Sequence, residues 1–144
     1  MAKHARVDVI NEILRIGVIP VFYNEDFETA RAVVEACAAA GLRLVEFTNR
    51  GDNAYRIFSD LVLHFAKANP DIILGGGSVI DAATAGLYIS SGANFVVGPV
   101  LNTEVARLCN RRKISYSPGC GSASEISAAE ELGWRSSRSS RAIR

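Results

Sequence analysis

The sequence has 144 residues, of which 49% are hydrophobic and 22% charged, and its formal net charge is +1. This composition is ordinary for a globular protein with one core, and no apolar run reaches the roughly 18 residues that a membrane-spanning helix needs. Residues 1–9 lack the apolar stretch of a secretory signal, and the three cysteines show neither metal-binding nor disulfide spacing, so we expect free thiols in the cytoplasm.

The positive charge is concentrated at the C-terminal end of the sequence. Residues 135–144 contain four arginines and no acidic residue, which leaves 12 basic against 15 acidic residues in the rest of the chain. The main part of the chain therefore lacks the basic surface that is typical of a nucleic-acid-binding protein.

The chain opens with a predicted helix, Ala5–Arg15, whose apolar side would carry Val7, Ile10, Ile13 and Leu14. Short apolar runs and helical patterns then alternate with a period of about 25 residues. The predicted strands, which we expect to be buried, are Val18–Phe22, Leu42–Thr48, Ile72–Leu74, Phe95–Val97 and Ile114–Tyr116. The helices predicted to follow them cover residues 24–41, 53–68, 81–90, 103–110 and 124–132.

This alternation predicts parallel β/α units with right-handed crossovers. Every predicted strand ends in polar or glycine-rich residues, which favours a barrel, where functional groups gather at the carboxyl ends of the strands. Because a closed barrel takes eight units and about 250 residues, we predict a (β/α)8 TIM-barrel family in which only about the first five units are present, preceded by a helix. A complete five-stranded doubly wound sheet of flavodoxin size is the alternative that the length favours.

The second predicted strand ends in the segment with the most chemical character. Alternation along the strand puts Glu46, Thr48 and Arg50 on one side. A glutamate that faces a barrel interior needs a partner or a task, and a general acid/base is one such task. An arginine two positions beyond the strand end is suited to holding a carboxylate in a bidentate pair. A structural Glu46–Arg50 salt bridge is the alternative.

Three further features follow strands or lie on helices. The glycine-rich turn expected at Gly75–Ser78 would let backbone amides approach a ligand closely, although such a turn alone is a weak signal. Pro99 and Pro118 are expected to form turns. His64 is expected on a helix face or in the core, because no second metal ligand stands near it.

Five segments together resemble a known family: Gly17–Val21, Val45–Arg50, Gly75–Val79, Gly92–Val97 and Ser117–Glu125. In order and spacing they are similar to 2-keto-3-deoxy-6-phosphogluconate (KDPG) aldolase and its sister activity, 4-hydroxy-2-oxoglutarate (KHG) aldolase. The resemblance implies a barrel, usually a homotrimer, that needs no metal or other cofactor. It implies cleavage of a 2-keto-4-hydroxy acid to pyruvate and an aldehyde.

The resemblance also implies roles for individual residues. Glu46 matches the catalytic general acid/base, and Arg50, Ser78 and Pro99 match substrate-binding positions. Ser78 stands where the family commonly has a threonine. Gly98-Pro99-Val100 stands where many members have Ser-Pro-Gly, which we expect to alter the edge of the pocket.

The family's reaction needs a lysine that forms a Schiff base with the substrate ketone. The resemblance places it on a sixth strand, directly after the helix that ends near Gly133. The only lysines in the sequence are Lys3, Lys67 and Lys113, of which the last two precede strands and are expected at the end of the sheet opposite Glu46. We therefore predict no Schiff-base lysine in this chain, and an inactive chain.

We divide the chain into a partial aldolase domain, residues 1–133, and a basic tail, residues 134–144. One base inserted ahead of the Trp134 codon opens a frame that can encode E-I-V-K-I-F-P-G, the segment expected of the sixth strand, so we expect a frameshift. A natural basic tail that contacts RNA or an acidic membrane is the alternative.

Two other functions stay open at this point. One is a non-catalytic β/α module that binds a small oxo-acid or pairs with intact subunits, and the other is a different phosphate-handling barrel enzyme. An open five-stranded sheet would expose strand edges and inner faces, so we expect low solubility or dependence on a partner.

Overall fold

The structure, a computed structural model, describes residues 2–133 as a parallel five-stranded sheet in the order β1-β2-β3-β4-β5. The strands are β1 (Val21–Phe22), β2 (Leu44–Thr48), β3 (Ile73–Gly77), β4 (Phe95–Gly98) and β5 (Ser115–Pro118). The helices are α1 (Arg6–Ile16), α2 (Phe27–Ala39), α3 (Ala54–Ala68), α4 (Ala82–Ser90), α5 (Thr103–Arg112) and α6 (Ala123–Glu131). None of these helices has both the length and the apolar character needed to cross a membrane.

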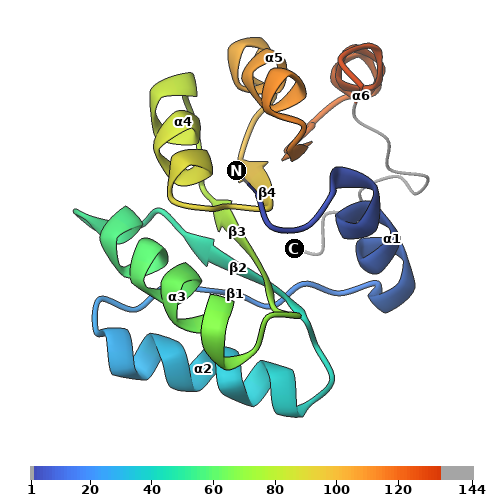
Figure 1. Cartoon of the computed structure of the whole chain (residues 1–144). Helices are drawn as coiled ribbons and strands as arrows, with labels where there is room; N and C mark the ends of the chain where they lie inside the picture. Colours follow the sequence, from blue (N-terminus) through green and yellow to red (C-terminus); the bar gives the residue numbers. More distant parts are fainter. Residues whose placement is uncertain (1, 134–144) are drawn as a thin grey trace.

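The strand order decides between the two predicted architectures. A doubly wound sheet of the flavodoxin type has the order 2-1-3-4-5, whereas here every strand pairs with the next one along the chain. Helices α2 to α6 follow one another in an arc around one side of the sheet, and α1 lies on the open side of that arc (Figure 1). The chain is therefore a partial α/β barrel with an N-terminal helix, and the doubly wound alternative is wrong.

Polar side chains at the strand–helix junctions fix where the helices begin. The Asp26 carboxylate accepts a hydrogen bond from the backbone N–H of Thr29 at the start of α2 (2.7 Å), and Asp81 does the same for Thr84 at the start of α4 (2.8 Å). Asn102 and Ser122 cap α5 and α6 in the same way. Each cap contributes about 1 kcal/mol, so the short loops that follow the strands are held in place.

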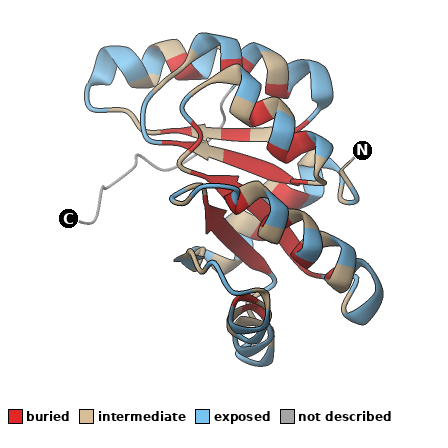
Figure 2. Cartoon of the chain, turned by 90° about the vertical axis from the view of Figure 1, so that its left-hand side faces the viewer, coloured by how far each residue is buried: buried red, intermediate tan, exposed pale blue. Residues whose placement is uncertain are grey.

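Alternation along the strands sorts the core into two clusters. The larger cluster lies between the sheet and α2–α5 and includes Val45, Phe47, Leu74 and Val96. The intervening residues Leu44, Ile73 and Phe95 face the inside of the partial barrel and pack with Val9 of α1. The strands are buried along most of their length, while each helix is buried on one side only (Figure 2).

The predicted apolar face of the first helix is wrong in part: Ile13 packs against the inner cluster as predicted, but two of the other predicted residues lie on the exposed side. Val7 and Leu14 are 61% and 53% exposed, whereas Val9 and Glu12 are buried. Glu12 accepts hydrogen bonds from Arg15 (2.7 and 2.9 Å) and from Arg43 just before β2 (2.9 and 3.1 Å). Because a charged residue lies at the centre of the buried face, a search for periodic apolar residues does not find this face.

Two predicted strands also differ from the structure. The first is not buried: it shortens to Val21–Phe22, and Val18 and Val21 are 55% and 51% exposed because β1 is an edge strand whose inner side is uncovered. The third is longer than predicted, because Gly75, Gly76 and Gly77 are ladder residues of β3 rather than a loop. The glycine-rich turn is therefore wrong as a prediction.

Candidate active site

The carboxyl ends of β2, β3 and β4 bring the predicted site residues to one end of the sheet. The register pairs Val21 with Glu46 and Glu46 with Gly75, and it pairs Thr48 with Gly77. Paired residues of parallel strands point to the same side of the sheet. Val21, Glu46 and Gly75 therefore form one inward-facing layer, and Thr48 and Gly77 form the next. Both layers lie further toward the carboxyl end than Leu44 and Ile73, against which Val9 of α1 packs.

Glu46 is the only glutamate or aspartate on the described strands, and it is 8% exposed. Within residues 2–133, no group donates a hydrogen bond to its carboxylate, and no cation lies within ion-pair distance. Burial raises the pKa of the Glu46 carboxyl, and the nearby charge of Arg50 offsets that rise only in part. A raised pKa and the lack of a partner favour the protonated form of this carboxyl group over that of a solvated glutamate, which suits it to proton transfer.

Arg50 lies beyond the end of the strand, not on it. Strand β2 ends at Thr48, whose carbonyl accepts a hydrogen bond from the Arg50 backbone N–H (2.9 Å). The Arg50 side chain is exposed and forms no ion pair with Glu46, so the structural salt bridge considered as an alternative is not formed. Among residues 2–133 the Arg50 guanidinium has no ion-pair partner, and its charge acts on Glu46.

The loops after β2 and β3 are joined to each other. The Asn49 backbone N–H donates to the carbonyl of Gly77 (2.9 Å), and the Asn49 side chain accepts from the hydroxyl of Tyr88 in α4 (3.2 Å). Ser78 follows with φ of 57°, in the left-handed region, where a β-branched residue is strongly disfavoured. Serine therefore adopts the backbone conformation of this loop with less strain than threonine would.

Pro99 and the end of β5 complete the described part of the site. Pro99 is exposed just after β4, and the Gly119 backbone N–H donates to the carbonyl of Gly98 (2.7 Å). A side chain at Gly119 would collide with the Pro99 carbonyl, so these two loops touch. Ser117 pairs with Val97 and shares the inner face, a position that the sequence analysis did not single out. Counting alternate residues from the strand register would have found it.

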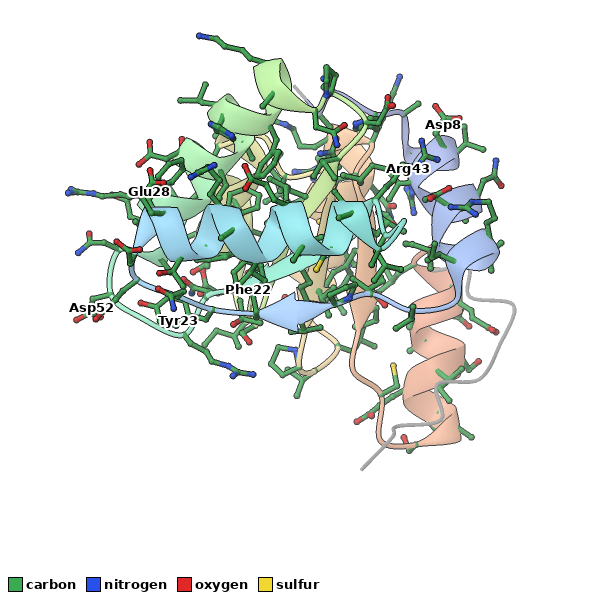
Figure 3. The ribbon with its side chains drawn as sticks, turned by 90° about the horizontal axis from the view of Figure 1, so that it is seen from below. Asp8, Phe22, Tyr23, Glu28, Arg43 and Asp52 are labelled. Atoms are coloured by element: carbon green, nitrogen blue, oxygen red, sulfur yellow. The ribbon has the colours of Figure 1, made fainter. Side chains whose placement is uncertain are left out.

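The two ends of the sheet differ in what surrounds them. Figure 3 shows Tyr23 beside the loop that carries Asp52 at one end of β1, and Arg43 beside α1 at the other end. The three lysines belong to the second end: Lys67 is in the last turn of α3, Lys113 caps α5 ahead of β5, and Lys3 lies against the start of β3. All three are exposed.

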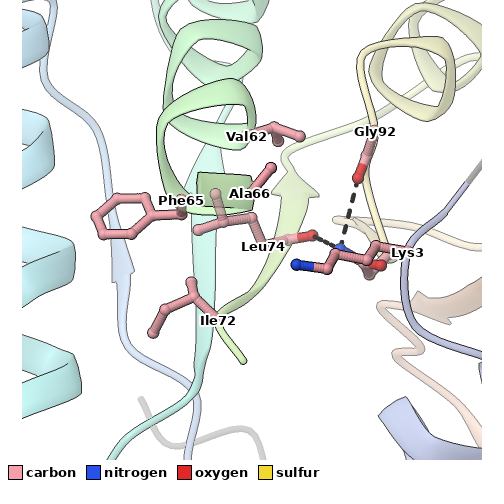
Figure 4. A pocket seen from close by; sticks show the side chains of 8 residues that line it. Lys3, Val62, Phe65, Ala66, Ile72, Leu74 and Gly92 are labelled. Carbon is pink, nitrogen blue, oxygen red and sulfur yellow. Dashed lines mark hydrogen bonds between the residues drawn. The ribbon is translucent and has the colours of Figure 1, made fainter. Parts of the chain in front are cut away.

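A cavity of about 210 Å³ lies at the end of the sheet opposite Glu46. It is lined mainly by apolar residues of α3 and β3, with Lys3, Gly92 and Asn94 at its edge (Figure 4). Asn94 donates hydrogen bonds to the carbonyls of Leu74 (3.3 Å) and Gly92 (3.5 Å), so its amide is engaged in holding the chain together. This cavity is therefore separate from the carboxyl end of the sheet that carries Glu46.

The described residues contain no cluster of three or more histidine, cysteine, aspartate or glutamate side chains suited to a metal ion. His64 lies between Phe27 and Phe65, with ring centroids 6.0 and 4.9 Å away. It is a partly buried histidine of the helix face, as predicted. The predicted tail, residues 134–144, lies outside the described residues.

Comparison with known proteins gives one family. The model of the KDPG and KHG aldolase family matches residues 9–139. Among curated proteins, the 2-dehydro-3-deoxy-phosphogluconate aldolases of Pseudomonas aeruginosa and Haemophilus influenzae are 31% and 28% identical, over 92% and 87% of this chain. The chain spans 58% and 57% of the length of these two relatives.

Solved structures of the same kind match the fold. The KDPG aldolase of Legionella pneumophila, with pyruvate captured as a covalent carbinolamine intermediate, superposes with a TM-score of 0.73 and 28% identity. The aldolase of Zymomonas mobilis ZM4 with 3-phosphoglycerate gives 0.71 and 27%. Both matches cover 81% of this chain, but only 54% and 53% of the matched chains.

Proposed function

Because this chain belongs to the KDPG and KHG aldolase family, we propose that it carries the proton-transferring part of an aldolase site. The reaction is the reversible cleavage of a 2-keto-4-hydroxy acid to pyruvate and an aldehyde. The observation that carries the proposal is the buried Glu46 carboxyl, whose pKa is raised and which has no hydrogen-bond partner among residues 2–133. A structural carboxylate at 8% exposure would have a cation or several donors beside it.

We assign the four site residues as follows. Glu46 moves protons to and from the substrate hydroxyl through water. Arg50 binds the substrate carboxylate, because its guanidinium is exposed and has no ion-pair partner among residues 2–133. Ser78 and Pro99 form the rim of the pocket above β3 and β4, where Ser78 offers a hydroxyl to the substrate.

The Schiff-base lysine is not supplied by Lys3, Lys67 or Lys113 in this proposal. All three belong to the amino end of the sheet, and Glu46 faces the carboxyl end. A nucleophile must reach the substrate carbonyl within hydrogen-bond range of the acid/base residue. The lysine therefore comes from a segment that is not among these residues.

Two measurements test the proposal. The 144-residue chain, incubated with pyruvate and borohydride, is expected to show no trapped adduct by mass spectrometry and to release no pyruvate from KDPG or KHG. A hybrid enzyme is then made by joining residues 1–133 to the part of the Legionella pneumophila aldolase that follows its own fifth β/α unit. We expect the hybrid to release pyruvate, whereas an inactive but folded hybrid would contradict the proposal.

A second candidate function is binding of a small oxo-acid without cleavage. It is favoured by the same lysine positions, which leave Arg50 and Ser78 as binding groups without a nucleophile. Binding of pyruvate to the chain, followed by amide shifts in NMR, with no turnover in the hybrid enzyme, would favour it over the aldolase.

We propose a cytoplasmic setting and a homotrimer for the complete enzyme. The free thiols of Cys37, Cys109 and Cys120 support the first proposal, because a reducing compartment preserves them. The resemblance to the family supports the second, and light scattering on the hybrid enzyme tests it.

A further inference from the structure

The residues of β3 that face Glu46 on the inner side of the sheet, Gly75 and Gly77, are glycines, and they leave space beside the β3 backbone. The Glu46 Cα pairs with Gly75, and its carboxylate lies over Gly77, two residues further along β3. A Cβ built on Gly77 would lie 2.8 Å from Glu46 Cγ and 2.5 Å from Cδ, and it would overlap with Oε1. The Glu46 side chain therefore rests directly on the β3 backbone.

The position of Phe95 explains why the Glu46 side chain lies over Gly77 and not over Gly75. The Phe95 ring occupies the space over Gly75, where a Cβ would overlap with three of its ring carbons. Phe95 is fully embedded in the inner cluster with Val9, Leu44 and Ile73, so the ring cannot move aside. The space over Gly75 is filled from the β4 side, and the Glu46 carboxylate takes the space over Gly77.

The backbone of Gly77 does not itself require glycine. Positive φ angles occur at four other glycines of the described chain, Gly17, Gly41, Gly92 and Gly133, but not at Gly77. Alanine in a strand is ordinarily no worse than glycine, which loses more conformational entropy on folding. A side chain at this position would instead meet the Glu46 carboxylate, the far end of a flexible side chain, which would have to shift.

We propose that Gly77 is a positioning residue for Glu46. Because Gly77 has no side chain, the acid/base carboxylate can lie against the β3 backbone, next to the space that the Phe95 ring fills over Gly75. The inference rests on the proposed role of Glu46 in proton transfer. In this position Glu46 is only 8% exposed, which keeps the pKa of its carboxyl group raised. A larger residue at position 77 displaces the carboxylate toward solvent.

A double-mutant cycle on the 144-residue chain tests the contact itself. Gly77→Ala is expected to lower the urea midpoint and the Tm, because the methyl group and the carboxylate compete for one space. In the Glu46→Ala background, Gly77→Ala is expected to leave both values unchanged or to raise them. A Gly77→Ala chain that fails to fold, while the double variant folds, supports the proposal equally. An equal loss in both backgrounds would overturn it.

A titration tests positioning separately from stability. The Glu46 carboxyl is followed by carbon-detected NMR, assigned through Glu46→Gln, in the parent chain and in Gly77→Ala. We expect its pKa to move down in Gly77→Ala, toward the value of about 4.3 of a solvated glutamate. An unchanged titration in a folded Gly77→Ala chain would overturn the proposal.

Gly86→Ala is the matched control. It also adds one methyl group, and the only atom within 4 Å of its Cβ is a Leu108 methyl at 3.8 Å. It should leave the Glu46 titration unchanged and show no coupling to Glu46→Ala. None of these measurements needs substrate or turnover, so a hybrid enzyme without activity would contradict the proposed function and leave the Gly77 result standing.

Discussion

The two ends of the sheet each contain one buried glutamate, and the two carboxyl groups are in opposite states. At the amino end, Glu12 is 5% exposed, and hydrogen bonds from Arg15 and then Arg43 lower its pKa to about 2. At the carboxyl end, Glu46 is 8% exposed, and burial raises its pKa with only partial compensation by Arg50. The two shifts are opposite because hydrogen bonds from arginines dominate at Glu12, whereas desolvation by burial dominates at Glu46.

This difference separates a structural end from a chemical end. Glu12 and Arg43 fix α1 across the inner side of the sheet, where Val9 fills the bottom of the partial barrel. Glu46 lies one layer further along the strands, against the glycine backbone of β3, and its carboxylate has no ion-pair partner among residues 2–133. A buried carboxyl group with a raised pKa and no ion-pair partner among the described residues is a candidate for a functional site.

A substitution of Glu46 is expected to lower the catalytic rate far more than the same substitution of Glu12. In the hybrid enzyme, Glu46→Gln is expected to lower kcat by about 10²- to 10⁴-fold, because general acid/base catalysis contributes that range. Steady-state pyruvate release measures it. Glu12→Gln in the same hybrid should keep kcat within a small factor. Comparable losses in the two variants would remove the distinction between the two ends.

The second effect concerns the stability of the structural end. Glu12→Gln is expected to lower the free energy of unfolding by about 1–2 kcal/mol, a figure reduced for the exposure of both arginines. Because the folded pKa of Glu12 lies below the ordinary value of about 4.3, its stabilisation is present above that pH. It is lost as the pH falls toward the folded pKa of about 2. Urea unfolding at several pH values measures the difference between parent and variant.

An exposed pair with the same spacing provides the control for Glu12. Glu28 pairs with Arg31 at 2.7 Å, three residues apart as Glu12 and Arg15 are, but the Glu28 side chain is 67% exposed. Glu28→Gln is expected to change the free energy of unfolding by less than about 0.5 kcal/mol. If Glu12→Gln were equally mild, burial would not distinguish the two pairs.

Glu46 is expected to affect stability in the opposite pH direction to Glu12. Since the folded pKa of Glu46 is raised, its contribution to stability is present below about pH 4.3 and is lost as the pH rises through the folded pKa. Glu46→Gln should therefore match the parent chain at acid pH and be the more stable of the two near pH 8. Thermal unfolding at both pH values checks this, and a parent chain that is the more stable one near pH 8 would contradict the raised pKa.

Local sequence signals predicted most of the fold and the main candidate for a site residue, Glu46. The strand Leu44–Thr48 and the helix start signals of Asp26 and Asp81 could be predicted, because apolar runs and capping side chains act within a few residues. Glu46 stood out because a charged residue interrupts an otherwise apolar strand. The buried face of α1 could not be predicted, since its centre is Glu12, and the arginine that completes its pairing is 31 residues away.

The sequence alone determined the parallel β/α alternation, the family resemblance and the positions of the lysines relative to the strands. The tertiary structure decided that the five strands lie in barrel order, that Glu12 is paired while Glu46 is not, and that the glycines of β3 belong to the sheet. The physical reason is the distance along the sequence over which each interaction acts. Helix caps and periodicity depend on neighbours in sequence, whereas the state of a carboxyl group depends on what the fold places beside it. For Glu46 those neighbours are the Gly77 backbone and the Phe95-filled space over Gly75, which no local pattern reveals.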